Sequence, residues 1–274
     1  MLLISACNTQ NINQELPQIT SIISLSPPVT EILLELGVLD KIIAIDKYSR
    51  DISYINPSVT LIDTTPLDLD TIINLDPNIV IVSTTYDLDQ LTSAGITSLY
   101  IPNGNTIADI KNNIMLIANT LDIQSKGTEL TNYMAYQIDH FKQIGQTIQN
   151  PRRVYFEIYP SPYFGSFGSH TILHELLEIV GATNIFAAYQ GFITVPYEKI
   201  LELDPEIIIA SANIHRYPVA EILSRPGFED TTAAHNNWIF PVNTAANNIY
   251  SHNIIQTLHK LSLIMELTRF CPFY

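Results

Sequence analysis

The segment LDPEIIIAS at residues 203–211 repeats, with few changes, the segment LDPNIVIVS at residues 75–83. In both copies a run of apolar, mostly β-branched residues follows Leu-Asp-Pro, and such a run predicts a strand buried on both faces of a parallel sheet. The residues before each copy place apolar side chains at helical spacing, and the proline disfavours helical backbone at the aspartate before it. Each copy therefore predicts a short helix that ends at Asp-Pro and leads into a buried strand.

A second pair of similar segments indicates that the two halves of the chain share one plan. TEILLELG at residues 30–37 and HELLEIVG at residues 174–181 both predict a helix whose last glycine takes the left-handed cap conformation. The order strand, helix, strand thus occurs in both halves. We predict an α/β fold with two lobes and mainly parallel sheets, at residues 19–121 and 151–274.

Residues 122–150 predict a single helix between the lobes. Apolar and aromatic residues recur three and four positions apart in this stretch, and no proline occurs before Pro151. Gly127 and Gly145 lower the helix propensity, but the spacing still predicts about six or seven turns. A single long helix would make the lobes a nearly rigid pair, with a ligand cleft between them.

Composition excludes several classes of partner. The 274 residues carry a net charge of -14, and a chain this acidic lacks the cationic face that nucleic acid or anionic lipid requires. No apolar run is long enough to span a membrane. The chain also lacks a nucleophile motif, a phosphate-binding loop and a dinucleotide fingerprint, so we predict that it is not an enzyme.

The N-terminal segment MLLISAC resembles the lipobox of a bacterial lipoprotein, in which the cysteine is lipidated and becomes the N-terminus. Residues 1–18 are then a signal remnant and a polar tether, and Cys7 holds the protein on the outer side of a membrane, in the periplasm or at a cell surface. An ordinary buried cysteine is the alternative. No basic residue precedes the apolar run, which departs from the usual signal pattern.

The repeated strands also locate a ligand site. In open α/β sheets, ligands bind beyond the carboxyl ends of the strands, where the chain here continues into loops with Tyr86 in one half and His215 in the other. Aromatic residues gather in the other loops expected at this edge, and they suit flat or ring-bearing ligands. An equally open reading is that single aromatic residues close the ends of the two cores.

The order of these motifs over residues 19–267 resembles the class III solute-binding proteins of bacterial ABC importers, which are the cobalamin-, haem- and ferric-siderophore-binding lipoproteins. The resemblance implies cargo-binding aromatic residues at matching loop positions. These are Tyr48, Tyr86, Phe164, Phe192 and Tyr250. It further implies His215 or His252 as a cargo-binding histidine, with His215, Tyr86 and Tyr250 as candidate iron ligands.

The basic residues near these loops are few, namely Arg50, Arg216 and Arg225. Each is a candidate to bind carboxylate groups of a cargo, and a solvated surface charge is the alternative. The resemblance also implies that Asp70 and Glu198, at equivalent positions of the two repeats, dock on the two permease subunits. The alternative is that these acids only stabilise the N-termini of their helices through the helix dipole.

The predicted cargo is an iron-containing chelate, a ferric siderophore or haem, with cobalamin and a bare divalent metal ion as alternatives. Binding of a bare metal needs several converging histidines, for which His170, His215 and His252 are the candidates. A role as an adhesin remains a further alternative. We expect no tightly bound cofactor, a monomer, and contact with a membrane only through the lipid anchor.

Two further predictions concern the scaffold of the C-terminal lobe. Ser169 is predicted to cap the helix that carries His174, and Trp238 is predicted to lie in a core strand.

Overall fold

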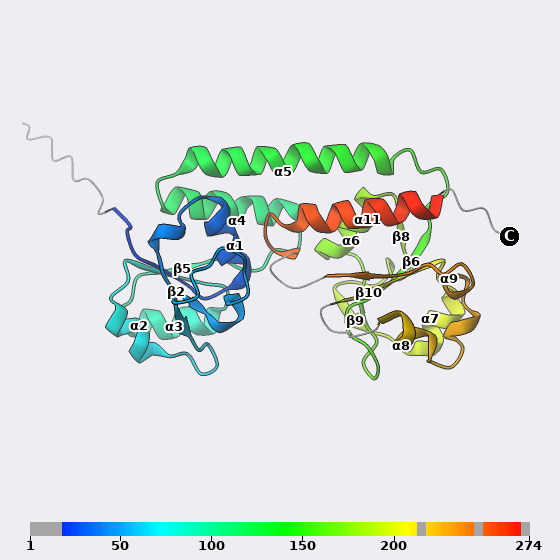
Figure 1. The fold of residues 1–274 in the computed structure, drawn as a ribbon, viewed down its shortest axis with the longest axis horizontal. Coiled ribbons are helices and arrows are strands. Elements are labelled where there is room, and N and C mark those ends of the chain that lie inside the picture. The colour runs from blue at the N-terminus through cyan, green and yellow to red at the C-terminus, as the bar shows by residue number, and fades with distance from the viewer. Residues whose placement is uncertain (1–17, 213–217, 244–248, 270–274) are drawn as a thin grey trace, which may run out of the picture.

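The computed structural model describes residues 18–212, 218–243 and 249–269. Two α/β lobes lie next to each other along the long axis of the molecule, and one long helix runs along the same edge of both (Figure 1). The predicted two-lobe α/β fold is thereby confirmed. None of the described helices is both long enough and apolar enough to cross a membrane.

Both lobes contain a parallel sheet. In spatial order, the N-terminal sheet consists of β3 (Thr60–Ile62), β2 (Ile42–Asp46), β1 (Ile22–Ser24), β4 (Ile79–Val82) and β5 (Ser98–Tyr100). The C-terminal sheet consists of β11 (Ile239–Val242), β10 (Ile207–Ser211), β6 (Arg153–Glu157) and β8 (Thr183–Asn184). The order β8-β6-β10-β11 matches β2-β1-β4-β5. The two repeated strands, β4 and β10, therefore occupy equivalent places, as the sequence predicted.

One antiparallel element departs from this plan. The strands β7 (Gly165–Phe167) and β9 (Phe192–Thr194) form a two-stranded ribbon in the C-terminal lobe. The ribbon lies on the side of that lobe that faces the N-terminal lobe (Figure 1). Sequence patterns predicted mainly parallel sheets and did not locate this ribbon, because β7 falls inside an aromatic loop with no clear alternation.

The repeated short helices are α2 (Leu69–Leu75) and α7 (Tyr197–Leu203). Each ends at the aspartate of Leu-Asp-Pro, and these aspartates have left-handed backbone with φ of 45° and 39°. Proline disfavours right-handed helical backbone before it, and aspartate tolerates the left-handed region better than most residues. The predicted helix ends are confirmed.

Helices α1 (Pro27–Glu35) and α6 (Ile172–Ile179) are followed by Gly37 and Gly181, both with φ of 72°. This confirms the two predicted left-handed glycines. The prediction that Ser169 caps α6 is wrong, because the N-cap is Thr171, whose hydroxyl accepts a hydrogen bond from the His174 N–H at 3.3 Å. His170 therefore precedes the helix and does not share a helical face with His174.

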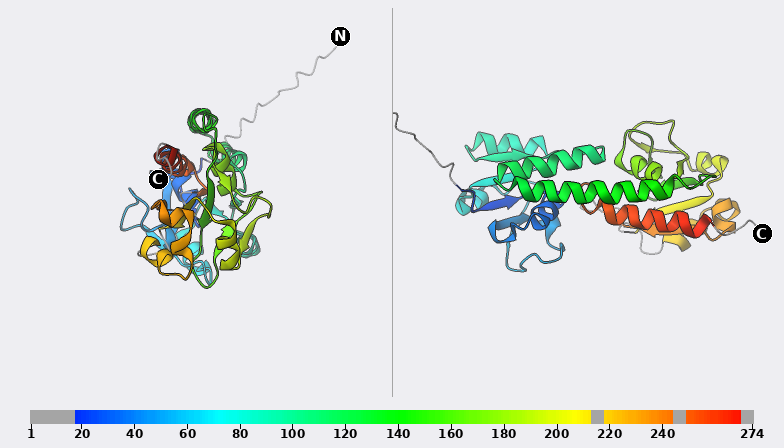
Figure 2. Two further views of the ribbon diagram at one scale, coloured as in Figure 1. Left: turned by 90° about the vertical axis from the view of Figure 1, so that its right-hand side faces the viewer. Right: turned by 90° about the horizontal axis from the view of Figure 1, so that it is seen from above.

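The long helix is α5 (Gln124–Gly145), which lies inside the predicted residues 122–150. It packs on α4 (Ile107–Thr120) in the N-terminal lobe and on α11 (Ile254–Arg269) in the C-terminal lobe. Seen from above, α5 and α11 run alongside each other (Figure 2). The helix thus has a packed partner in each lobe.

The two glycines of α5 mark its closest contacts. A Cβ atom at Gly127 would clash with the Cβ of Ala118 in α4, and one at Gly145 would clash with the carbonyl oxygen of Ile179 in α6. Glycine weakens an isolated helix, but it lets two backbones approach closely. The residues that lower the helix propensity therefore fix α5 against both lobes.

One buried apolar cluster passes through both lobes. It includes Ile22 and Ile114 of the N-terminal lobe, Val154 of the C-terminal lobe, and Leu130 and Met134 of α5. Two smaller clusters, one in each lobe, lie beneath α2 and α7 through Ile72 and Ile200. A continuous core of this kind supports a rigid arrangement of the lobes, because opening them would expose apolar surface.

Polar contacts also join the lobes. The Glu175 carboxylate of α6 accepts a hydrogen bond from the Ile107 N–H at the start of α4, at 2.9 Å. On α1, the Glu35 carboxylate lies 3.5 Å from Nε2 of His252, just before α11. The structure also describes the helices α3 (Thr85–Ser93), α8 (Pro218–Leu223) and α9 (Thr232–His235), and the 3-10 helices Leu39–Lys41, Lys47–Ser49 and Phe228–Asp230.

Candidate functional site

A cavity of about 750 Å³ lies between the lobes and is called the inter-lobe cavity. Its lining includes Glu31 and Glu35 of α1, Asp51, and Lys260 of α11. The remaining lining residues are Leu34, Leu39, Ile52, Ser53, Tyr54, Asn243, His252, Asn253 and Gln256. Three carboxylates against one lysine give this lining a negative charge, while the amide side chains supply hydrogen-bonding groups.

His252 is the predicted site residue that lines this cavity. Its side chain is 12% exposed, and its Nε2 faces Glu35 from the other lobe. Burial lowers the pKa of His252 below its ordinary value, although the carboxylates of Glu35 and Glu31 oppose that shift. Nδ1 is buried and has no hydrogen-bond partner among the described residues. A neutral imidazole between two lobes is therefore the state favoured at neutral pH.

A second cavity of about 430 Å³ lies on the C-terminal lobe and is called the aromatic cavity. Tyr159, Tyr163 and Phe192 line it with 55%, 67% and 53% of their surfaces exposed. The other lining residues are Ile158, Gly165, Ser166, Ile193 and Thr194. Rings left half in water around an apolar hollow are typical of a binding surface for a flat or apolar ligand.

The tyrosines of this cavity belong to a hairpin at residues 158–165, called the aromatic hairpin. The Ile158 N–H donates to the Gly165 carbonyl at 2.8 Å, and the Gly165 N–H donates to the Tyr159 carbonyl at 2.9 Å. A Cβ atom at Gly165 would lie 2.8 Å from the ring of Tyr159. The glycine therefore makes room for the tyrosine ring across the hairpin.

Tyr250 lies near Tyr159 but is not among the residues that line the aromatic cavity. It is partly buried, and burial together with the neighbouring phenol of Tyr159 raises its pKa above the ordinary value. Tyr250 is therefore a neutral phenol at neutral pH. The electrostatic effect of Tyr159 on Tyr250 indicates that two phenols from separate loops lie near each other.

Phe164, although it belongs to the aromatic hairpin, packs on the core of the lobe. It is half-buried, its ring centroid is 6.1 Å from that of Tyr197, and it packs against the core beneath α7. It is not among the residues that line the aromatic cavity. Arg225 packs against the same ring and is bound to Glu157, at 2.6 and 2.8 Å. The structure therefore assigns Arg225 to a buried ion pair and not to a cargo carboxylate.

In the N-terminal lobe, Tyr48 and Arg50 lie just beyond the carboxyl end of β2. The turn that carries them is held by Asp46, whose carboxylate accepts hydrogen bonds from the Tyr48 N–H at 2.8 Å and the Ser49 N–H at 3.2 Å. Burial raises the pKa of Asp46, although these bonds and the Ser49 hydroxyl oppose the shift. Tyr48 is 66% exposed, and Arg50 is exposed too.

Tyr86 lies beyond the end of β4, in the first turn of α3. The Thr84 hydroxyl caps this helix by accepting a hydrogen bond from the Asp87 N–H at 3.1 Å. Tyr86 is 66% exposed, like Tyr48. Both tyrosines are therefore exposed to solvent at the carboxyl edge of the N-terminal sheet, where a ligand is expected to bind in this fold.

Asp70 and Glu198 are the second residues of α2 and α7. Both are exposed, and neither carboxylate makes a hydrogen bond or ion pair with another residue in the described ranges. Their helices lie on the edge of the molecule opposite α5, one in each lobe (Figure 1). The two carboxylates are thus presented to solvent by equivalent helices.

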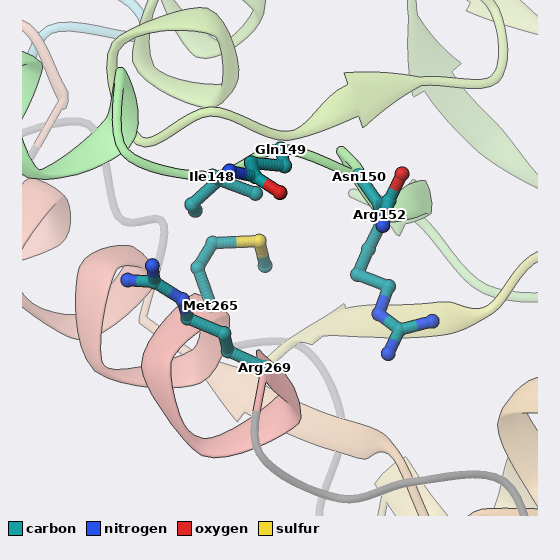
Figure 3. A pocket seen from close by; sticks show the side chains of 6 residues that line it. All are labelled: Ile148, Gln149, Asn150, Arg152, Met265 and Arg269. Atoms are coloured by element: carbon teal, nitrogen blue, oxygen red, sulfur yellow. The ribbon is translucent and has the colours of Figure 1, made fainter.

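A further cavity of about 310 Å³ lies at the junction of α5, β6 and α11 and contains two arginines (Figure 3). Arg152 donates to Glu206 at 2.8 Å and lies over the ring of Trp238 at 5.0 Å, while Arg269 donates to the Thr147 hydroxyl at 3.1 Å. Both guanidinium groups are already occupied. Trp238 is buried here, which confirms that it is a core residue.

Three predicted residues, Cys7, His215 and Arg216, lie outside the described residues. Within the described ranges, no group of three or more histidine, cysteine, aspartate or glutamate side chains is placed to hold a metal ion. Sequence reasoning did not single out Tyr54, which lines the inter-lobe cavity and is 89% exposed. It also did not select Tyr159 and Tyr163, although both lie in an aromatic loop that the sequence shows plainly.

The sequence profile of the periplasmic binding protein family matches residues 22–243. This chain belongs to the periplasmic binding protein family. The match confirms the resemblance drawn from the sequence motifs. Members of this family bind solutes, and the two cavities described above are consistent with a binding role.

Similar proteins include the uncharacterized ABC transporter substrate-binding lipoprotein YvrC of Bacillus subtilis (strain 168). It is 24% identical over 232 residues, which cover 81% of this chain and 72% of YvrC. The vitamin B12-binding protein of Yersinia pseudotuberculosis serotype O:3 (strain YPIII) is 25% identical over 201 residues, 69% of each chain.

Among solved structures, a possible iron-binding periplasmic solute-binding protein of Staphylococcus epidermidis ATCC 12228 has a TM-score of 0.82 and 21% identity. The alignment covers 90% of this binding protein and 99% of that chain. The periplasmic heme-binding protein RhuT of Roseiflexus sp. RS-1 has a TM-score of 0.79 and 20% identity, over 90% and 97% of the two chains. These similarities show the shared fold.

Proposed function

We propose that this chain is the cargo-binding protein of an ABC importer and that it carries a metal chelate, first of all an iron chelate such as a ferric siderophore or haem. The aromatic cavity carries this proposal, because three rings stand more than half exposed around an apolar hollow. A soluble protein gains from covering such a surface with a ligand. The similarity to a possible iron-binding protein and a heme-binding protein supports an iron-containing cargo.

Cobalamin is the second candidate, and the similarity to vitamin B12-binding proteins favours it. A corrin ring also suits an aromatic wall. A bare divalent ion has less support, because His170 lies on an exposed loop next to Ser169 while His252 faces Glu35 between the lobes. His170 and His252, the two histidines of the bare-metal hypothesis that the structure describes, therefore lie in different surroundings.

Tyr86, Tyr250 and His215 are the proposed iron ligands within the cargo complex. Tyr250 is a neutral phenol without cargo, because burial and Tyr159 raise its pKa. Binding to ferric iron requires phenolate, so coordination by Tyr250 would release a proton. Proton release on binding, measured by calorimetry in buffers of different ionisation enthalpy, should decrease in Tyr250→Phe by the proton that this phenol would lose.

Asp70 and Glu198 are proposed to dock on the two permease subunits. Their exposure, the lack of a partner among the described residues and their equivalent places in two lobes fit a two-fold symmetric transporter. Cys7 is proposed as the site of lipidation, which would hold the protein at the outer side of a membrane. The lipoprotein YvrC is similar to this chain, which supports that anchor.

The experiment that tests the proposal is a titration of the purified protein, beginning at Asn8, with haemin, a ferric hydroxamate siderophore and cyanocobalamin. Binding is followed by absorption and calorimetry, because Trp238 lies buried against Arg152 and is a poor reporter of either cavity. Sub-micromolar binding of one chelate would identify the cargo class. Binding of none, with a thermal shift by a bare divalent metal ion, would refute the chelate proposal.

A further inference from the structure

The aromatic hairpin is anchored from beneath by a buried ion pair. Glu157, the last residue of β6, is fully buried and immediately precedes the hairpin. Its carboxylate accepts hydrogen bonds from Nη1 and Nη2 of Arg225 at 2.6 and 2.8 Å, and from the Tyr155 hydroxyl at 3.0 Å. Burial and the Glu157 carboxylate raise the pKa of Tyr155 well above its ordinary value, so the phenol remains a donor. The carboxylate is thus held by three donors in fixed directions.

Arg225 connects this carboxylate to another segment of the lobe. Nη2 also donates to Glu221 of α8 at 3.2 Å. The planar guanidinium forms two parallel bonds to a carboxylate only in one orientation, which an ammonium group does not impose. The hairpin and α8 are therefore held in one relative position by a single side chain.

The same guanidinium is packed between two rings. Its central carbon lies 5.3 Å from the ring centroid of Phe164 and 5.4 Å from that of Phe228. Phe164 has a φ of 43°, a backbone conformation that bulky residues rarely adopt. Since the backbone does not favour this conformation, packing against Arg225 helps to keep it. Phe164 in turn directly follows Tyr163, which lines the aromatic cavity.

We propose that Glu157 and Arg225 are positioning residues for cargo binding, an inference that rests on the proposed function. Their ion pair fixes Phe164 on one side of the hairpin and thereby holds Tyr159 and Tyr163 in place on the other. Binding to a wall that is already ordered avoids the entropy loss of immobilising its rings. A buried ion pair contributes little net stability compared with apolar packing, so its main contribution here is the fixed geometry.

The test compares Arg225→Lys with Arg152→Lys. Arg152 is a matched control because it also pairs with a glutamate, Glu206, at 2.8 Å and lies over an aromatic ring, but it lines neither the aromatic nor the inter-lobe cavity. Hydrogen exchange of residues 158–166 is measured in the cargo-free proteins. We expect about tenfold faster exchange of the hairpin amides in Arg225→Lys only, since one charge-assisted bond and the ring packing are lost.

Affinity is then measured for the chelate that the wild type binds among haemin, a ferric hydroxamate and cyanocobalamin. Arg225→Lys should bind about tenfold more weakly, through faster dissociation, while Arg152→Lys should bind like the wild type. Unchanged hairpin exchange, equal effects of the two variants, or a loosened hairpin with unchanged affinity would each overturn the proposal.

A second variant keeps the test decisive if Arg225→Lys does not fold. The double variant with Glu157→Gln and Arg225→Met removes both charges of the buried pair together. It should show the same faster exchange of the hairpin, and unchanged exchange would overturn the proposal. If the wild type binds none of the chelates, the proposed function fails, but the exchange comparison still decides whether the ion pair positions the hairpin.

Discussion

The two lobes share a strand order and a pair of short helices, yet they present different walls to a ligand. The N-terminal lobe offers single exposed tyrosines, with Tyr48 on the 3-10 turn beyond β2 and Tyr86 in the first turn of α3 beyond β4. The C-terminal lobe offers a continuous aromatic surface formed by the aromatic hairpin and Phe192. A duplicated scaffold has therefore acquired an asymmetric site.

The connection after the first strand of each lobe accounts for this difference. In the N-terminal lobe, only Leu25 and Ser26 separate β1 from α1, whereas residues 158–171 separate β6 from α6 and contain both the hairpin and β7. The strands are constrained by two buried faces, but a loop at the sheet edge tolerates insertion. New binding surface thus arises where the repeat is interrupted.

Each wall also rests on a buried carboxylate, and the two carboxylates differ in their partners. Asp46 accepts hydrogen bonds from its own turn, while Glu157 pairs with the guanidinium of Arg225. We expect Glu157→Gln to lower the free energy of unfolding by about 3 kcal/mol, because it leaves a buried guanidinium without its main partner. Asp46→Asn should lower the free energy of unfolding by less than about 1 kcal/mol. The amide oxygen can still accept hydrogen bonds from the turn, and the substitution removes a charge from a buried position.

Urea unfolding of the two variants at pH 7 measures this difference. Arg153→Lys, an exposed residue that also contacts a glutamate, serves as the control for a surface ion pair and should have little effect. Equal losses for Glu157→Gln and Asp46→Asn would contradict the idea that the C-terminal wall depends on a buried ion pair and the N-terminal wall does not.

The second expected effect concerns cargo affinity. Phe192→Ala should weaken binding of the chelate identified by titration by about tenfold to a hundredfold, because it removes one of the three exposed rings that line the aromatic cavity. Tyr48→Ala should weaken it by only about threefold, since that tyrosine stands alone in the other lobe.

Calorimetry gives both values, with Tyr136→Ala as the control. Tyr136 is 71% exposed on α5, on the edge of the molecule away from α2 and α7, and its removal should leave affinity unchanged. A larger loss for Tyr48→Ala than for Phe192→Ala would show that the N-terminal lobe supplies the main wall.

Much of the scaffold was predictable from the sequence, because buried strands and capped helices leave strong local patterns. The repeated LDP segments predicted β4 and β10, and Gly37 and Gly181 predicted the ends of α1 and α6. Even the misplaced cap at Ser169 was only two residues from Thr171, and both residues are suited to capping.

The walls of the site were less predictable, because their geometry depends on contacts between distant loops. Nothing local distinguishes Phe164, which packs on Arg225, from Tyr163, which lines the aromatic cavity. The pairing of Glu157 with Arg225 spans 68 residues, so sequence reasoning treated the arginine as a surface or cargo-binding group. Long-range polar partners of this kind require the fold.

The third prediction concerns the feature that remains symmetric. Asp70→Ala and Glu198→Ala should each lower cargo-stimulated ATP hydrolysis by the reconstituted importer about threefold, to similar extents, and leave cargo affinity unchanged. Glu129→Ala, an exposed acid on α5 at the opposite edge, is the control. An effect of only one of the two acids would show that the lobes dock unequally.

The smallest effect is expected at the contact between the lobes, where His252 faces Glu35 and Glu31 of α1 and lies in one cavity lining with Asp51 and Lys260. Burial lowers the pKa of His252 in the folded protein below its value of about 6.5 in the unfolded chain. As the pH falls below that value, the unfolded chain binds the proton first, so acidification removes stability. In His252→Gln, the free energy of unfolding should therefore fall less between pH 7.5 and pH 5 than in the wild type, while its value at pH 7.5 changes by less than about 1 kcal/mol.

Urea midpoints across this range, with the exposed His170→Gln as control, measure the slope of stability against pH. A steeper slope in His252→Gln than in the wild type would mean that protonated His252 strengthens the contact with Glu35, and that the carboxylates of α1 outweigh burial at this junction.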